Sequence, residues 1–164
     1  MFITIAALVA VQSGTPDADV ACILDRIPAS ARAAVIEEAG SGQSGPVRQS
    51  FVDSGEACAR QRSWTPDLAA NVGMRAAALV LRQEATAALG RHGIGVAPIE
   101  RWIEALPPAQ RNMDTLPEVR MDDLFERIVA TGVAQDTVEA QAASIGLYVG
   151  ARFAELALAT TRGR

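Results

Sequence analysis

Three carboxylates lie close together in one stretch of the sequence, at Asp122, Asp123 and Glu126. Asp122 and Glu126 are one helical turn apart, and paired carboxylates can hold a hard cation or divide the roles of general acid and general base. Asp123 also stands four residues before Arg127, which is the spacing of an ion pair on a helix surface. A solvated helix face is therefore the favoured interpretation, and the acidic cluster is kept as the candidate for carboxylate chemistry. Glu100 and Glu104 have the same spacing and the same interpretation.

The sequence contains one histidine, His92. A general base or a zinc site built on imidazole would have to use it alone. It precedes Gly93 at the end of a predicted helix, where a histidine interacts favourably with the last carbonyl groups. The chain shows no nucleophile–base set, no metal-ligand spacing and no phosphate loop in its proper context. We therefore assign no catalytic residue, no cofactor and no metal.

Two cysteines, Cys22 and Cys58, form an even number, as is typical of an oxidising compartment. A bond between them would close a loop of about 36 residues and contribute roughly 3–4 kcal/mol to stability. It would also remove both thiolates from any zinc site with His92. The alternative is a pair of unrelated buried thiols in a cytosolic protein. We predict the disulfide.

The segment 40–45 has the letters of a G-x-G-x-x-G dinucleotide fingerprint. That motif works only where a strand delivers the glycines to the start of a helix, so that backbone amides meet a pyrophosphate. Here the glycines follow a predicted helix and no strand precedes them. The segment is therefore predicted to be a loop between helices.

Arginines and glycines supply two further patterns. Arg75 and Arg82 are seven residues apart on one predicted helix face, and a guanidinium row can hold phosphate or carboxylate ligands. With a net charge of −4, ordinary surface arginines are favoured. Gly146 and Gly150 have the GxxxG spacing of membrane helix dimers, but their helix also carries charged residues. Close helix packing inside a soluble bundle is therefore expected.

The elements that must position these residues all have the 3.6-residue period of helices. The predicted helices span residues 17–27, 29–39, 46–62, 66–92, 98–106, 117–132 and 136–160. Thr65 before Pro66, and Asp136 before the last segment, are expected helix caps. The last helix is apolar on two sides, which is usual for a central helix. One side has Val138, Ala142, Ile145, Val149, Phe153 and Leu156, and the other has Leu147, Ala151, Ala154 and Leu158. No alternating run is long enough for a strand, so we predict an all-α, compact bundle of six to seven helices around the C-terminal helix.

The chain begins with an apolar run at residues 2–11, which is too short for the roughly 20 residues that cross a bilayer. It fits the apolar region of a signal peptide over residues 1–13, although no basic residue precedes it. A buried element of the fold and a retained anchor are the alternatives. We expect the remainder, 14–164, to form one all-α domain.

The composition and charge of the chain exclude some classes of protein. The chain has 164 residues, 49% of them apolar and 4% aromatic. These values exclude intrinsic disorder, and the acidic balance argues against binding to nucleic acid or through a polybasic membrane patch. All fifteen basic residues are arginine, for which codon bias is a sufficient cause.

These observations predict a secreted or periplasmic protein, with a cytoplasmic location as the alternative, and no integral membrane span. The expected role is non-enzymatic interaction or scaffolding, with a protein partner or a second copy. One alternative is a carrier that binds an apolar small molecule between helices, where small residues such as Gly146 and Gly150 leave a cavity. The other is an enzyme that uses carboxylates and arginines alone. An apolar pocket of at least about 300 Å³ would favour the carrier.

Overall fold

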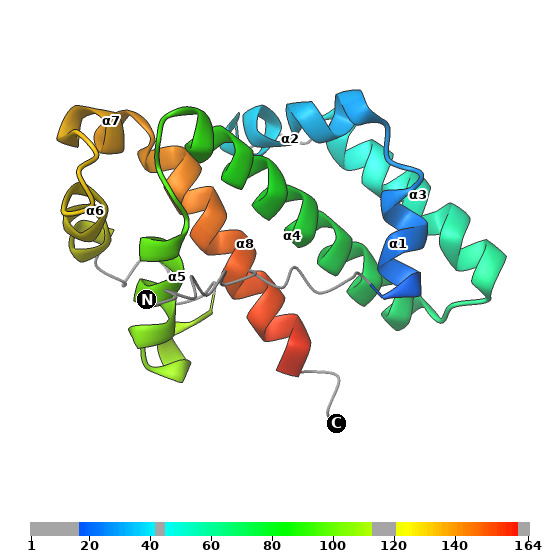
Figure 1. Cartoon of the computed structure of the whole chain (residues 1–164). Coiled ribbons are helices and arrows are strands. Elements are labelled where there is room, and N and C mark those ends of the chain that lie inside the picture. The colour runs from blue at the N-terminus through cyan, green and yellow to red at the C-terminus, as the bar shows by residue number, and fades with distance from the viewer. Residues whose placement is uncertain (1–16, 42–44, 113–120, 161–164) are drawn as a thin grey trace, which may run out of the picture.

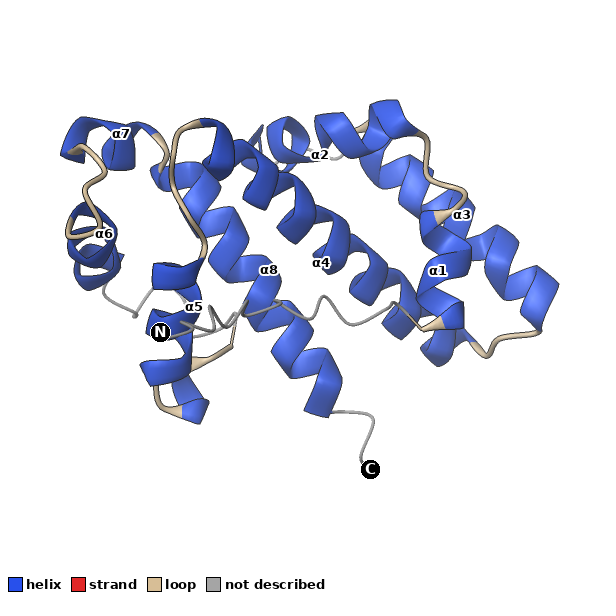
Figure 2. Cartoon of the chain, in the orientation of Figure 1, coloured by secondary structure: helices blue, strands red, loops and turns tan. Residues whose placement is uncertain are grey.

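The structure is a computed structural model that describes residues 17–41, 45–112 and 121–160. The described chain forms helices joined by turns and loops, without a strand, so the all-α prediction is confirmed (Figure 2). The helices are α1 (Ala18–Leu24), α2 (Ala29–Ser41), α3 (Pro46–Arg62), α4 (Pro66–Arg91), α5 (Ala97–Ala105), α6 (Met121–Val129), α7 (Gln135–Ala140) and α8 (Ala142–Thr160), with a 3₁₀ turn at Pro108–Gln110.

Local signals in the sequence set several helix ends. The side chain of Asp17 accepts a hydrogen bond from the Val20 amide at 2.9 Å and caps α1. Thr65 caps α4 in the same way through the Leu68 amide. Gly93, with φ of 73°, follows the C-cap residue His92 in a left-handed conformation that glycine adopts without strain. The predicted start of the sixth helix, at Pro117, lies outside the described residues.

One predicted element is wrong in detail, because the segment 136–160 is two helices rather than one. The helix α7 ends at Ala140, and Gln141 forms a turn before α8 begins. The cap position before α7 is Ala134, and Asp136 lies in its first turn. The turn lets α7 contact α6, whereas α8 runs along α4.

The helices α4 and α8 lie side by side across the middle of the molecule in roughly opposite directions (Figure 1). On one side are α1, α2 and α3, and on the other are α5, α6 and α7. The two sides have separate apolar cores. The N-terminal core contains buried residues Val20, Ile23, Leu24, Ile27, Ala31, Val35, Val47, Cys58, Val72, Ala76 and Val80. The C-terminal core contains Ala85, Leu89, Ile94, Ile99, Trp102, Ile103, Leu124, Ile128, Val138, Ile145, Tyr148, Val149 and Phe153.

The two cores share α4, whose first half packs into the N-terminal core and whose second half packs into the C-terminal core. Ile36 on α2 contacts both. One predicted face of the last helix is confirmed, since Ile145, Val149 and Phe153 are fully buried. The fold therefore depends on α4 and α8 as its common axis.

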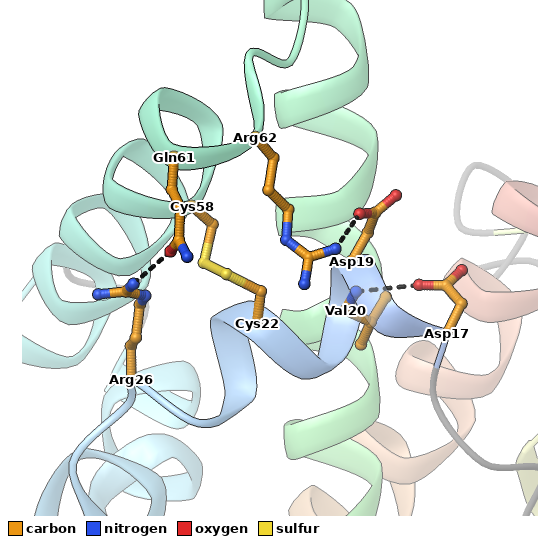
Figure 3. Close-up of a disulfide and its surroundings, with 8 residues drawn as sticks. All are labelled: Asp17, Asp19, Val20, Cys22, Arg26, Cys58, Gln61 and Arg62. Atoms are coloured by element: carbon orange, nitrogen blue, oxygen red, sulfur yellow. Dashed lines mark hydrogen bonds and ion pairs between the residues drawn. A yellow bond between two sulfur atoms is a disulfide. The ribbon is translucent and has the colours of Figure 1, made fainter.

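The predicted disulfide is present and joins α1 to α3 (Figure 3). Cys58 is fully buried in the N-terminal core, and its Cα lies 6.1 Å from that of Cys22. An ion pair beside the disulfide also joins these helices, from Arg62 to Asp19 at 2.9 Å. At the far end of α1, Arg26 donates a hydrogen bond to Gln61. The disulfide and these polar contacts fix α1 on the α3 surface.

Within the described residues, one segment is long and apolar enough to cross a membrane by length and composition, namely Ala142–Ala159 of α8. Its mean hydropathy is 1.3. The central helix of a soluble bundle has the same properties, so this is a weak indication of a membrane span. The same segment packs along α4 and carries Arg152 and Glu155 near its middle.

Candidate ligand-binding groove

An apolar groove of about 710 Å³ runs between α8 on one side and α2 and α3 on the other, with α4 as its floor. Its size falls within the roughly 300–1,000 Å³ of small-molecule sites. The residues that line it are Val35, Glu38, Ala39, Val47, Arg48, Phe51, Met74, Ala77, Ala78, Leu81, Gly146, Leu147, Gly150, Ala151, Ala154, Ala157 and Leu158. All but Glu38 and Arg48 are apolar.

The second apolar face of α8 forms one wall of this groove. Leu147, Ala151, Ala154 and Leu158, which the helical period places on one side, all line it. The expected close packing is absent at Gly146, the first glycine of the GxxxG pair. A β-carbon built on Gly146 would have no heavy atom of another element within 4 Å. Gly146 therefore leaves space beside α8, whereas Ala151 on the same helix is buried.

The opposite wall and the floor add larger side chains. Phe51 on α3 and Leu81 on α4 are half-buried, and both also contact the N-terminal core. Met74 on α4 is 54% exposed. Methionine is flexible and polarisable, so it adapts to ligands of different shape. The groove therefore combines a rigid alanine and glycine surface with one adaptable side chain at its edge.

The polar residues of the groove lie where α2 ends and α3 begins. The Glu38 carboxylate accepts hydrogen bonds from the backbone amides of Gly45, Val47 and Arg48, at 3.0, 2.9 and 2.9 Å. It thus satisfies the free N–H groups at the start of α3, although it belongs to the preceding helix. Burial raises the pKa of Glu38, but these three hydrogen bonds outweigh it and lower the pKa overall. The carboxylate stays ionised in its structural position.

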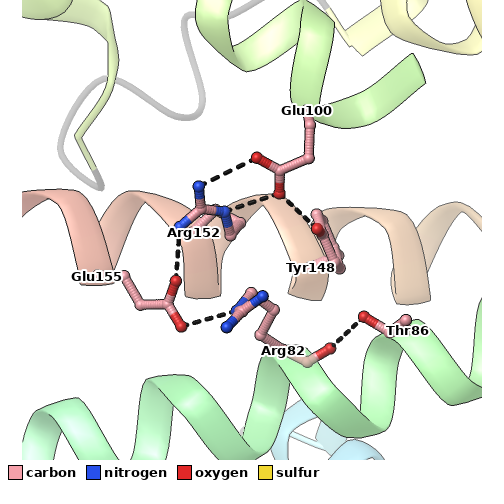
Figure 4. Close-up of polar contacts among 6 residues, drawn as sticks. All are labelled: Arg82, Thr86, Glu100, Tyr148, Arg152 and Glu155. Atoms are coloured by element: carbon pink, nitrogen blue, oxygen red, sulfur yellow. Dashed lines mark hydrogen bonds and ion pairs between the residues drawn. The ribbon is translucent and has the colours of Figure 1, made fainter. Parts of the chain in front are cut away.

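A second polar arrangement joins α8 to α5 and α4 (Figure 4). Arg152 makes two hydrogen bonds to the Glu100 carboxylate, at 2.7 and 3.0 Å, and the Tyr148 hydroxyl donates to the same carboxylate. Arg152 also contacts Glu155 at 2.6 Å, and Glu155 pairs with Arg82 at 2.8 Å. We call these five residues the interhelical network. Its groups pair with one another and do not line the groove.

The charges of the interhelical network stabilise one another. Burial raises the pKa of Glu100, but hydrogen bonds from Arg152 and Tyr148 outweigh it and hold the pKa below its ordinary value of 4.5. Burial and the bond to Glu100 raise the pKa of Tyr148. The bond to Glu100 also raises the pKa of Arg152. Glu100, Tyr148 and Arg152 therefore keep their ordinary charges near neutral pH, which suits a structural role better than proton transfer.

Two sequence interpretations need correction here. Glu100 is not on a solvated helix face, since its side chain is 26% exposed and paired with Arg152. Arg75 and Arg82 are not ordinary surface arginines, because each joins its helix to another. Arg75 pairs with Asp17 at 2.7 Å. No pattern in the sequence signals these ion pairs, whose members are 52 to 73 residues apart.

The acidic cluster lies on α6, where Asp122, Asp123 and Glu126 are exposed. Asp123 forms the i,i+4 ion pair with Arg127 at 3.0 Å, with both side chains about half exposed. The cluster does not line the groove. In the part of the chain that the structure describes, no group of three His, Cys, Asp or Glu residues is arranged to hold a metal ion. His92 occupies the expected C-cap position of α4.

No protein-family model, no curated protein and no solved structure matches this chain. The groove is therefore interpreted from its own residues. The sequence indicated its α8 wall, through the second apolar face and the paired glycines. The wall from α2 and α3, with Glu38 and Arg48, had no corresponding signal, because it depends on how distant helices meet.

Proposed function

We propose that this protein is a non-enzymatic carrier that binds an apolar small molecule in the groove between α8 and the α2–α3 pair. The observation that carries the proposal is a groove of about 710 Å³ whose lining residues are apolar except for Glu38 and Arg48. Apolar surface that is withdrawn from water by a ligand contributes about 25 cal/mol per Å². An apolar molecule thus gains affinity along the groove without needing a polar partner.

A paired substitution tests the carrier role in the full-length protein. Gly146→Leu places a side chain in the open space beside α8, whereas Gly90→Leu makes the same change at an exposed position of α4. Binding of the neutral fluorophore N-phenyl-1-naphthylamine is measured by fluorescence titration. We expect the dissociation constant to rise by about tenfold or more for Gly146→Leu, about 1.4 kcal/mol, and to stay unchanged for Gly90→Leu. Equal binding by wild type and Gly146→Leu would refute the carrier role.

The same proposal places the protein in an oxidising compartment, secreted or periplasmic. The disulfide between Cys22 and Cys58 supports it, since such bonds are rare in the cytosol. The apolar run at residues 2–11 supports it as the core of a signal peptide. Intact mass spectrometry of protein from its native cells should find a chain that begins near Gly14 and is lighter by two hydrogens. A full-length, reduced chain would contradict both parts.

Interaction or scaffolding remains the second candidate. Among the residues that the structure describes, three large apolar side chains are exposed, Val52 at 43%, Leu68 at 41% and Met74 at 54%, and they offer contacts to a protein partner or a second copy. Light scattering over a concentration series separates the two roles. A dimer that Gly146→Leu disrupts would favour interaction, and a monomer that binds the fluorophore would favour the carrier.

A further inference from the structure

The two cysteines of the disulfide differ in exposure. Cys58 has no exposed surface and lies in the N-terminal core, whereas Cys22 is half-buried on α1. We propose that Cys22 is a modification site, at which the disulfide of the folded protein exchanges with an external thiol of low molecular weight. Cys58 is then the leaving sulfur when the bond opens and the attacking sulfur when it closes. This inference goes beyond the carrier role and does not depend on the groove.

Access decides which sulfur of a disulfide an external thiolate attacks. No part of Cys58 meets solvent in the folded protein, and Val20, Val47 and Val72 belong to the same buried core. A reagent reaches Cys58 only if the helices around this core separate. Such an opening exposes several apolar side chains and costs a large part of the free energy of folding. Direct attack on Cys58 is therefore blocked in the folded state.

Cys22 lies on a short helix at the surface, outside the fully buried stripe by which α1 packs into the core. The side chains of Arg26 and Arg62 lie on either side of the disulfide (Figure 3). Both arginines are exposed, and their contacts to Gln61 and Asp19 are made at the surface. Long exposed side chains change rotamer within nanoseconds, so they do not close off the approach to Cys22.

The exchange at Cys22 conserves atoms and electrons. A thiolate from outside forms a bond to the Cys22 sulfur, the bond between Cys22 and Cys58 breaks, and its electron pair leaves on Cys58 as a thiolate. The product is a mixed disulfide on Cys22. A second external thiolate can attack the outer sulfur of this mixed disulfide, which releases a small-molecule disulfide and leaves both cysteines reduced.

The fold favours closure of the bond from the mixed disulfide. The ion pair between Asp19 and Arg62 and the buried apolar stripe hold α1 on α3 without the disulfide. Cys58 therefore stays next to Cys22 in the mixed disulfide. Its thiolate attacks Cys22 and expels the external thiol, with the advantage that a held neighbour has over a reagent in solution.

Single-cysteine variants of the full-length protein test the site. Cys58→Ala leaves Cys22 as a free thiol, and Cys22→Ala leaves Cys58. Each variant is mixed with oxidised glutathione, and intact mass spectrometry follows the formation of the mixed disulfide. We expect Cys22 to react faster than Cys58 by at least about tenfold, because only Cys58 requires an opening of the core. In denaturing urea the two rates should become equal, which is the control for the intrinsic reactivity of the thiols.

Thermal unfolding checks that both variants are folded. Equal rates in the folded variants would overturn the inference, as would a faster reaction at Cys58.

A measurement on the wild-type protein keeps the test independent of the variants. Reduced glutathione is added in excess, and the loss of the disulfide is followed with and without urea at concentrations below the unfolding transition. Exchange at Cys22 in the folded protein should proceed at the same rate under both conditions. A reduction that requires unfolding instead becomes faster as urea lowers the free energy of unfolding. A rate that rises with urea in this range would show that neither sulfur is reached in the folded state, and would refute the proposal.

Discussion

Gly146 keeps the groove open at the expense of helix stability. Glycine in a helix interior is less favourable than alanine by about 0.5–1 kcal/mol, because it loses more backbone freedom on folding. No contact across the groove explains its presence, since a β-carbon there would meet nothing within 4 Å. A residue that lowers stability without improving packing is consistent with a requirement for space.

The first prediction concerns this residue. Gly146→Ala should raise the free energy of unfolding by about 0.5–1 kcal/mol, because alanine is the better helix former and its methyl group has room. Urea denaturation followed by circular dichroism measures the change. A loss of stability would mean that another element approaches Gly146 closely, contrary to the structure.

Glu100 determines how part of the stability depends on pH. Its pKa is lower in the folded protein than its ordinary value of 4.5. The folded state therefore binds this proton less readily than the unfolded state does. The resulting stabilisation is present above about pH 4.5 and is lost as the pH falls through the lowered pKa.

We predict that Glu100→Gln lowers the free energy of unfolding at pH 7 by about 1.5–3 kcal/mol, the usual range for hydrogen bonds to a charged group. The difference from wild type should shrink as the pH falls below 4.5. Urea unfolding at pH 7 and at pH 3 measures both values. Glu104→Gln, on the exposed face of the same helix, is the control. A difference that does not change with pH would contradict this role for the Glu100 charge.

At the level of whole helices, α1 depends on its attachments. A helix of seven residues is too short to be stable alone in water. It is held by the disulfide, by its buried stripe in the N-terminal core and by the ion pair between Asp19 and Arg62. The disulfide provides the covalent part of this attachment.

Replacing both cysteines, as Cys22→Ala with Cys58→Ala, should lower the free energy of unfolding by roughly 3–4 kcal/mol, because the unfolded chain regains the freedom of a loop of 36 residues. Urea denaturation measures the loss. A reducing agent should destabilise wild type by a similar amount and leave the double variant unaffected. An effect of reductant on the double variant would show that the loss does not come from this bond.

Much of the helix pattern follows from the sequence, because it depends on local chemistry. Thr65, Pro66 and Asp67 mark the start of α4 within three residues. The turn at Gln141 has no proline or glycine to signal it, and it arises where α7 contacts α6 while α8 follows α4. The walls of the groove also differ in whether the sequence predicts them. Its α8 wall follows from periodicity, but Glu38 and Arg48 gain their positions only when α2 and α3 meet.

For the molecule as a whole, the groove is a place where separate parts of the chain meet. Its walls come from α8, which serves the C-terminal core, and from α2 and α3, which serve the N-terminal core. A ligand there would contact both sides, and the complete site exists only in the folded protein. Ligand binding is therefore expected to stabilise the entire fold.

The expected size of this effect follows from mass action. At a free ligand concentration of 100 times the dissociation constant, the free energy of unfolding should rise by about 2.7 kcal/mol. Urea unfolding with and without N-phenyl-1-naphthylamine measures it, at the concentration that its own titration defines. Gly146→Leu at the same ligand concentration should gain much less. Equal gains in the two proteins would place the ligand outside the groove.

The division of α4 between two cores has a consequence for the order of assembly. Every buried member of the N-terminal core precedes residue 81, and both cysteines lie within that part of the chain. During synthesis or translocation with the N-terminus leading, the N-terminal core can pack and its disulfide can form before the later residues emerge. The C-terminal helices then pack against the second half of α4. The groove is completed last, when α8 docks on a surface that is already in place.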